Sequence, residues 1–108
     1  MTSLLKSIDY KSGNIKFMEN ELVFEDSIVK QLIFLREDLL QVEFDFGKYI
    51  LDIGWYPSFE ENGAFHVIVV KDANWSTPIY NTQTTVLANL QQTIQAAIDA
   101  LEAKRFEQ

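Results

Sequence analysis

The chain of 108 residues contains no cysteine. A disulfide framework, a thiolate zinc site and a cysteine nucleophile are therefore excluded. The one histidine, His66, makes a poor zinc site because no second nitrogen ligand accompanies it. With only four glycines, the chain has neither a glycine loop that cradles phosphate nor a G-x-S-x-G nucleophile motif. We therefore expect a protein that is not an enzyme and uses no metal or cofactor.

Long hydrophobic runs are missing as well. The longest apolar stretches, residues 32–35 and 67–70, have the length of a strand, whereas a helix needs about 20 residues to cross a bilayer. Residues 1–6 lack the basic region and the apolar run of a secretory signal. A chain without cysteine also suits the reducing cytosol. These absences predict a cytoplasmic protein that does not enter a membrane.

Basic residues are scarce relative to acidic ones, with 9 lysines and arginines against 16 aspartates and glutamates and a net charge of −7. This charge repels phosphate backbones, so direct binding to nucleic acid is not expected. It attracts a basic partner and speeds the encounter with one. The alternative interpretation is that the charge only keeps a small domain soluble.

Apolar side chains are plentiful, at 47% of the residues, with 13% aromatic. This is enough for one core, so residues 1–108 are predicted to form a single domain. Residues 1–27 are poorly readable, with candidate short strands at residues 15–18 and 22–24. Residues 28–35 are rich in β-branched and aliphatic residues and predict a strand, but a helix capped by Asp26 or Ser27 is the alternative.

The segment of residues 28–81 is predicted to form an antiparallel sheet. Residues 40–46 alternate apolar and polar side chains, which is the pattern of a half-buried strand. Gly47 and Lys48 predict a tight reversal into a strand over residues 49–56, and the dipeptide Asn62-Gly63 predicts a turn. A further strand follows over residues 64–71, and Ile79 with Tyr80 predicts a short edge strand.

The last segment differs in kind, because apolar residues recur every three or four positions over residues 84–105. This spacing predicts an amphipathic helix, with Thr84 or Thr85 as its N-cap. The predicted fold class is therefore α+β: an antiparallel β-meander of about four to five strands, with one face covered by a long C-terminal helix.

Alternation divides the strand residues between the two faces of the sheet. Trp55 falls on the core face, whereas Asp52 and Tyr56 fall on the opposite face. Gly54 leaves a gap in that opposite row, which predicts a bulge or the close approach of another segment. Pro57 ends the pairing because it has no N–H to donate. The core set contains no charge: Leu40, Val42, Phe44, Phe46, Tyr49, Leu51, Ile53, Trp55, Phe65, Val67 and Val69.

The opposite face mixes acidic residues with Ile50, Ile68, Val70 and Tyr56, which are too apolar for a face that meets only water. Three interpretations are open: an ordinary solvated face, a face that binds a partner, or a face covered by the N-terminal segment. A sheet edge can also accept a strand from a partner.

Three further features allow both a bland and a functional interpretation. Trp75 either folds back over the end of the core or anchors a partner. Phe59, beside Glu60 and Glu61, either staples its own loop or suits a basic partner with an apolar pocket. His66 and Asp52 on neighbouring strands would allow acid–base or metal chemistry, although a plain surface pair is the simpler interpretation.

Part of the chain resembles small bacterial immunity proteins, including those of contact-dependent growth inhibition. The resemblance is carried by residues 52–57, 63–69 and 75–78, followed by the terminal helix. It implies a cytosolic protein without enzymatic activity that binds one cognate toxin domain and blocks its active site or its substrate-binding surface. Many such toxins are basic nucleases, to which an inhibitor of charge −7 is complementary.

The resulting hypothesis is an immunity protein, a monomer or weak dimer, whose carboxylates pair with basic residues of a toxin while its aromatic residues anchor the complex. The alternative is an adaptor or a small-ligand-binding α+β module, which would form a homodimer through the exposed sheet face. The residues predicted to contact the partner are Glu43, Asp45, Asp52, Tyr56, Phe59, Glu60, Glu61 and Trp75.

Overall fold

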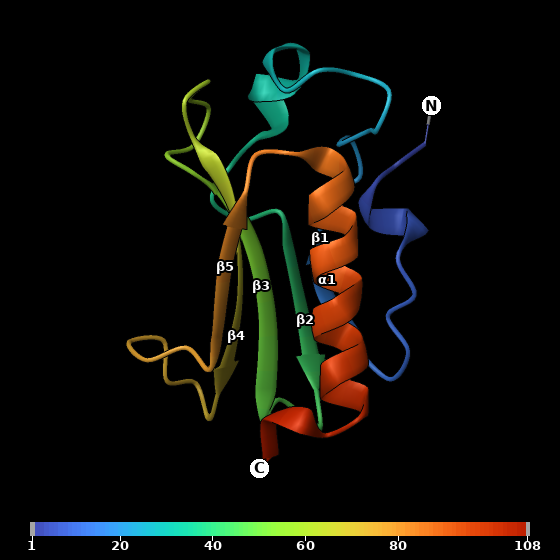
Figure 1. The fold of residues 1–108 in the computed structure, drawn as a ribbon, viewed down its shortest axis with the longest axis vertical. Helices are drawn as coiled ribbons and strands as arrows, with labels where there is room; N and C mark the ends of the chain where they lie inside the picture. The colour runs from blue at the N-terminus through green and yellow to red at the C-terminus, as the bar shows by residue number, and fades with distance from the viewer. Residues whose placement is uncertain (1, 108) are drawn as a thin grey trace.

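Five antiparallel strands form one sheet in the order of the chain, β1-β2-β3-β4-β5, in a computed structural model that describes residues 2–107 (Figure 1). A single α-helix, α1, packs across one face of this meander. The predicted α+β class is therefore confirmed, including the helix-covered face. The strands are β1 (Asn14–Met18), β2 (Leu40–Phe44), β3 (Tyr49–Tyr56), β4 (Ala64–Lys71) and β5 (Tyr80–Thr84), and α1 spans Leu87–Glu102.

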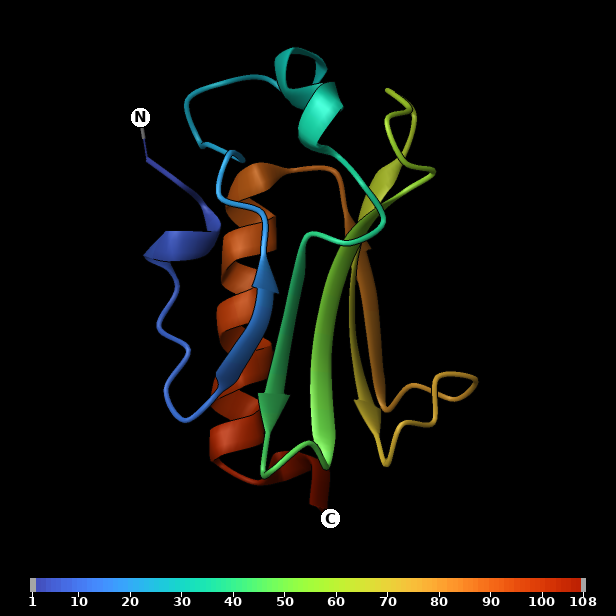
Figure 2. The same ribbon diagram turned by 180° about the vertical axis from the view of Figure 1, so that it is seen from behind.

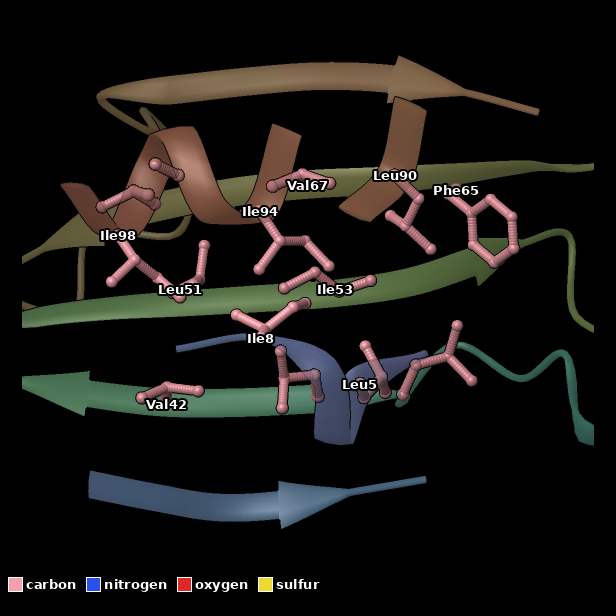
Figure 3. Close-up of a cluster of buried hydrophobic side chains, with 14 of the residues drawn as sticks. Leu5, Ile8, Val42, Leu51, Ile53, Phe65, Val67, Leu90, Ile94 and Ile98 are labelled. Atoms are coloured by element: carbon pink, nitrogen blue, oxygen red, sulfur yellow. The ribbon is translucent and has the colours of Figure 1, made fainter. Parts of the chain in front are cut away.

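The core lies between the sheet and α1, as the alternation of the strands predicts. Leu51, Ile53 and Val67 on the sheet and Ile94 and Ile98 on the helix are all fully buried (Figure 3). Burial of one such side chain contributes about 1.5–3 kcal/mol. A slip of one residue would turn these side chains to the other face, so the core fixes the register of the strands.

The N-terminal segment covers the same face as α1. Leu5 and Ile8, in and beside the short 3-10 helix η1 (Leu5–Ser7), are buried in the core cluster (Figure 3). The side chain of Gln95 on α1 bonds both the N–H and the carbonyl of Asp9, at 3.0 and 2.9 Å. This segment thus closes the core, and it does not cover the opposite face.

The strand predicted over residues 28–35 is wrong, because Val29–Phe34 forms a 3-10 helix, η2. Its Gln31 is buried, and the amide accepts from the N–H of Val23 at 2.7 Å and donates to the carbonyls of Val23 and Asp26 at 2.9 Å. These tertiary bonds hold a helical turn despite the β-branched composition, whose strand preference depends on context. The first strand of the sheet comes instead from residues 14–18.

The prediction that Phe46 faces the core is also wrong. Strand β2 ends at Phe44, which pairs with Tyr49, and the chain reverses over residues 45–48. Asp45, Phe46 and Gly47 all have positive φ angles, of 52°, 56° and 91°. The alternation therefore stops two residues early, and the Phe46 side chain is completely exposed.

The helix is shorter than the predicted residues 84–105. Its N-cap position is Val86, whose N–H donates to the Oγ1 of Thr84 at 3.1 Å, so Thr84 shapes the turn before the helix without being the N-cap. At the other end Arg105 begins a 3-10 turn, η3 (Arg105–Glu107). None of the helices among residues 2–107 has both the length and the apolar character of a membrane span.

Candidate functional site

The face of the sheet that points away from α1, here called the outer face, has no helix lying over it in the described part of the chain (Figure 2). It is only partly wetted: Val70 is fully buried, and Ile50 and Ile68 are half-buried. The cross-strand register places one row of side chains across all five strands of this face. The row consists of Phe17, Gln41, Asp52, Ile68 and Asn81.

A β-bulge brings Phe17 to the outer face. Ile15 lies opposite the core residue Val42, whereas Phe17, only two positions later, lies opposite the outer residue Gln41. In a regular strand the side chains of Ile15 and Phe17 would point to the same face of the sheet. The irregularity between them directs the Phe17 side chain to the outer face. Its ring is 44% exposed. Bulges of this kind often re-aim a side chain beside a binding site.

The segment that leads into β2 crosses directly over Gly54. A side chain at Gly54 would overlap the carbonyl oxygen of Glu37. The crossing is held by two backbone bonds, from the N–H of Trp55 to the carbonyl of Arg36 at 2.7 Å and from the N–H of Leu39 to that of Ile53 at 2.9 Å. The close approach predicted at Gly54 is therefore confirmed, and it places Glu37 and Asp38 beside the outer face.

Trp55 organises the loop that follows β3. Its indole is buried against Phe65, with ring centroids 4.7 Å apart, and its Nε1–H donates to the carbonyl of Glu60 at 2.8 Å. The N–H of Phe59 donates to the carbonyl of Leu35 at 2.7 Å. The backbone of the loop is thus hydrogen-bonded both to the Trp55 side chain and to the segment before β2, while Phe59 stays 53% exposed.

These elements enclose a cleft of about 680 Å³, here called the outer-face cleft. Exposed rings of Phe17 and Phe59 contribute to its walls, together with the carboxylates of Glu37, Asp38 and Asp52. The other residues that line it are Arg36, Leu40, Gln41 and Ser58. The cleft is therefore formed jointly by strands β1, β2 and β3, the segment that leads into β2 and the loop that follows β3.

The cleft is electrostatically negative. Arg36, the one cation among its described lining residues, is engaged by the buried carboxylate of Glu19, with Nη2 and Oε1 3.0 Å apart. Burial raises the pKa of Asp52 to about 6; the hydrogen bond that its Oδ2 accepts from Gln41 at 3.2 Å acts against this, and the charge of Asp38 adds to it. The pKa of Tyr56 is raised by burial and by the same group of carboxylates.

The raised pKa of Asp52 predicts a falling stability between about pH 4 and pH 6. Below this window the carboxyl is protonated in both states. Within it the unfolded chain, with the ordinary pKa of 3.8, releases the proton first, so the free energy of unfolding decreases as the pH rises. Asp52→Asn is expected to be more stable than wild type by about 1–2 kcal/mol at pH 7.5, because water that still reaches the carboxylate screens part of the effect.

Urea denaturation of both proteins at pH 3.5, 5 and 7.5 measures this difference. Asn81→Ala, an uncharged change in the same cross-strand row, serves as the control and is expected to keep the wild-type pH profile. If the free energies of unfolding of Asp52→Asn and wild type differ by the same amount at all three pH values, burial does not raise the pKa of Asp52.

The structure brings together most of the predicted contact residues but not all of them. Asp52 and Phe59 line the cleft. Tyr56, 38% exposed, lies beside it, with its ring centroid 4.8 Å from that of His66. Glu60 and Glu61 are exposed on the adjoining loop.

The other predicted contacts lie elsewhere. Glu43 and Asp45 line a separate hollow near the β2–β3 turn. Trp75, 46% exposed, is on the β4–β5 loop. This loop lies at the opposite end of the sheet from the β3–β4 loop, which carries Glu60 (Figure 1).

Sequence reasoning missed Phe17, Glu37 and Asp38 as neighbours of Asp52. The gap at Gly54 was the one signal that another segment had to approach β3. His66 lies opposite Gly54, and Asp52 lies opposite Ile68. Among residues 2–107, no three imidazole or carboxylate groups gather as a metal site requires.

No protein-family model, curated protein or solved structure matches this chain. Its function is therefore inferred from the chemistry of the outer-face cleft and from the charge of the chain.

Proposed function

We propose that the protein is an immunity protein that binds a cognate bacterial toxin domain with a basic surface, a nuclease in the first instance, and blocks its active site or substrate-binding surface. One observation supports this more than any other: the outer-face cleft is lined by three acidic and two exposed aromatic residues, on a face that no helix of residues 2–107 covers. In this role the protein acts in the cytoplasm as a binding module and catalyses no reaction.

The physical basis is complementarity of charge. A nuclease holds phosphate groups with lysine and arginine, so the surface it offers to an inhibitor is basic. Carboxylates at the cleft and on the loop of Glu60 and Glu61 would occupy that surface in place of phosphates. The net charge of −7 would steer the encounter, and exposed rings such as Phe59 would supply apolar anchors, which contribute heavily to binding energy.

The test is a rescue assay with the C-terminal domain of the protein encoded immediately upstream. Expression of that domain alone in a bacterium is expected to arrest growth, and co-expression of this protein is expected to restore growth and yield a stable one-to-one complex. Reversal of charge in Glu60→Lys/Glu61→Lys is expected to slow association about tenfold and to reduce its dependence on salt. Growth curves and stopped-flow binding give these results.

A matched control changes the same number of charges on the other layer of the molecule. Asp99→Lys/Glu102→Lys alters two acidic residues exposed on α1 and is expected to retain most of the association rate. If the upstream domain is not toxic, or is toxic without rescue or complex, the proposed function is wrong. An association rate that responds equally to both double variants would assign the effect to net charge and not to the loop.

A further inference from the structure

The carboxylates that line the outer-face cleft form no ion pair with a cation of the described residues. Among the described residues, the ion pairs are those of Lys11 with Asp99 and of Arg36 with Glu19. Neither includes Glu37, Asp38 or Asp52, and the Arg36 of the cleft lining is already paired with Glu19, so these three carboxylates are left without an ion-pair partner. Asp52 is half-buried and has only the neutral amide of Gln41 as its hydrogen-bond partner.

The same cleft exposes aromatic rings that the fold does not use in its core. Phe17 and Phe59 are 44% and 53% exposed, although both are large and apolar. The backbone beneath each ring is held in place, at Phe17 by the pairing of β1 with β2 and at Phe59 by its N–H bond to the carbonyl of Leu35. A side chain on an ordered backbone loses less conformational entropy on binding than one on a mobile segment, which must itself be ordered.

A guanidinium group matches this combination better than an ammonium group does. It is planar and weakly hydrated, it stacks on aromatic faces, and it forms two parallel hydrogen bonds with one carboxylate. A lysine ammonium is a compact and strongly hydrated charge, so transfer from water to a half-buried carboxylate costs it more. Arginine is also one of the residues enriched among binding hot spots.

We propose that the outer-face cleft is the docking pocket for one arginine side chain of the basic partner, with its guanidinium on the Asp52 carboxylate and against the rings of Phe17 and Phe59. This inference rests on the proposed function, because it names the group of the partner that the site accepts. Outer-face residues of β1, β2 and β3 line the cleft, and in the described part of the chain no helix lies over that face of the sheet (Figure 2). A protein lying on this face can therefore insert a side chain. The negative charge of the cleft favours a cationic side chain, and its aromatic rings favour a planar cation such as guanidinium.

The first experiment tests the pocket without the toxin. N-acetyl-arginine methylamide is titrated into the ¹⁵N-labelled protein, and the amide signals of Gln41, Asp52 and Phe59 are followed by NMR. We expect saturable shifts confined to the cleft, and at least about fivefold weaker binding of the matching lysine compound. Asp52→Asn is expected to abolish the shifts while remaining folded, since this variant is predicted to be more stable than wild type at neutral pH. Equal binding of the two compounds, or shifts that persist in Asp52→Asn, would overturn the proposal.

The second experiment measures the affinity of the toxin domain for three variants. Asp52→Asn and Phe59→Ala are each expected to weaken binding about tenfold or more, whereas Phe46→Ala, which removes an exposed phenylalanine outside the cleft, is expected to bind as wild type does. One arginine-to-lysine change in the toxin domain is expected to reproduce the loss, with little further effect of Asp52→Asn on top of it.

The outcomes separate the two proposals. If wild type binds the toxin domain and the cleft variants bind equally well, the arginine pocket is wrong and the immunity function stands. If wild type does not bind the toxin domain but the arginine compound occupies the cleft, the immunity function is wrong and the pocket stands for another basic partner.

Discussion

Gly54→Ala is expected to destabilise the protein by about 3 kcal/mol, a large effect for the addition of one methyl group. The new Cβ would overlap the carbonyl oxygen of Glu37 and lie 2.8 Å from Cε2 of Tyr56. Relief requires the segment of residues 36–38 to move away from β3, which breaks the bond from the N–H of Trp55 to the carbonyl of Arg36. Urea denaturation monitored by tryptophan fluorescence measures the change.

Gly47→Ala is the matched control, because it adds the same methyl group to another glycine. A Cβ there meets Glu43 no closer than 3.5 Å, and only the positive φ of 91° opposes the substitution. Its expected cost is about 1 kcal/mol. If both variants lose the same stability, the segment of residues 36–38 moves away from β3 at little cost. The inference that Glu37 and Asp38 form a rigid wall of the cleft would then be wrong.

Trp55→Ala is expected to cost about 3–5 kcal/mol and to loosen the loop that carries Phe59 and Glu60. The substitution empties a site that is 1% exposed, removes the edge contact with Phe65 and leaves the carbonyl of Glu60 without its indole donor. Hydrogen exchange at the amides of Phe59 and Gly63, which bond the carbonyls of Leu35 and Glu60, is expected to accelerate even where the rest of the sheet is protected.

The second tryptophan provides the comparison. Trp75→Ala makes the same change at a side chain that is 46% exposed on the β4–β5 loop, and its expected cost is below about 1 kcal/mol. A loss near that of Trp55→Ala would place Trp75 among the residues that hold the core, and it would cease to be a candidate contact for a partner.

Gly54→Ala and Trp55→Ala change neighbouring residues of β3. One of these residues supports the cleft from the outer face of the sheet and the other from the core face. Gly54 admits the segment carrying Glu37 and Asp38 over the outer face, and Trp55 fastens the following loop from the core side. Asp52, two residues before Gly54, provides the half-buried carboxyl. The strand therefore supplies one acid and positions both walls, and its mixture of acid, glycine and tryptophan has a structural reason at each residue.

The stability of the fold does not account for the composition of the cleft. The Asp52 carboxylate is expected to be destabilising at neutral pH, because burial raises its pKa. Phe17 and Phe59 are large and apolar, yet they are 44% and 53% exposed. Core residues nearby follow the ordinary rule and are buried. Local departures from what stability favours are expected where a protein binds something, and three of them, at Phe17, Asp52 and Phe59, line the outer-face cleft.

The amino-acid sequence by itself determined the sheet and its core face. Alternation over residues 40–44 and 49–56 leaves one row in each strand without a charged residue, which assigns that row to the core. Residues 64–71 extend this face with Phe65, Val67 and Val69, and the three-and-four spacing of α1 predicts the helix that covers it. The same local patterns assigned Trp55 to the core and Tyr56 and Asp52 to the other face. Such features depend on neighbours in the chain, whose geometry is fixed by the period of the strand or helix.

Only the tertiary structure decided where the outer-face cleft lies and which residues share it. Phe17 reaches the outer face through a bulge, η2 is held by the buried amide of Gln31, and Glu37 crosses Gly54 from 17 positions earlier in the chain. Each of these depends on contacts between segments whose separation in sequence carries no periodic signal. The reversal at residues 45–48 likewise depends on the pairing of Phe44 with Tyr49, which exposed Phe46 against the alternation. Local periodicity therefore specifies the layers of this protein, and long-range packing specifies its binding surface.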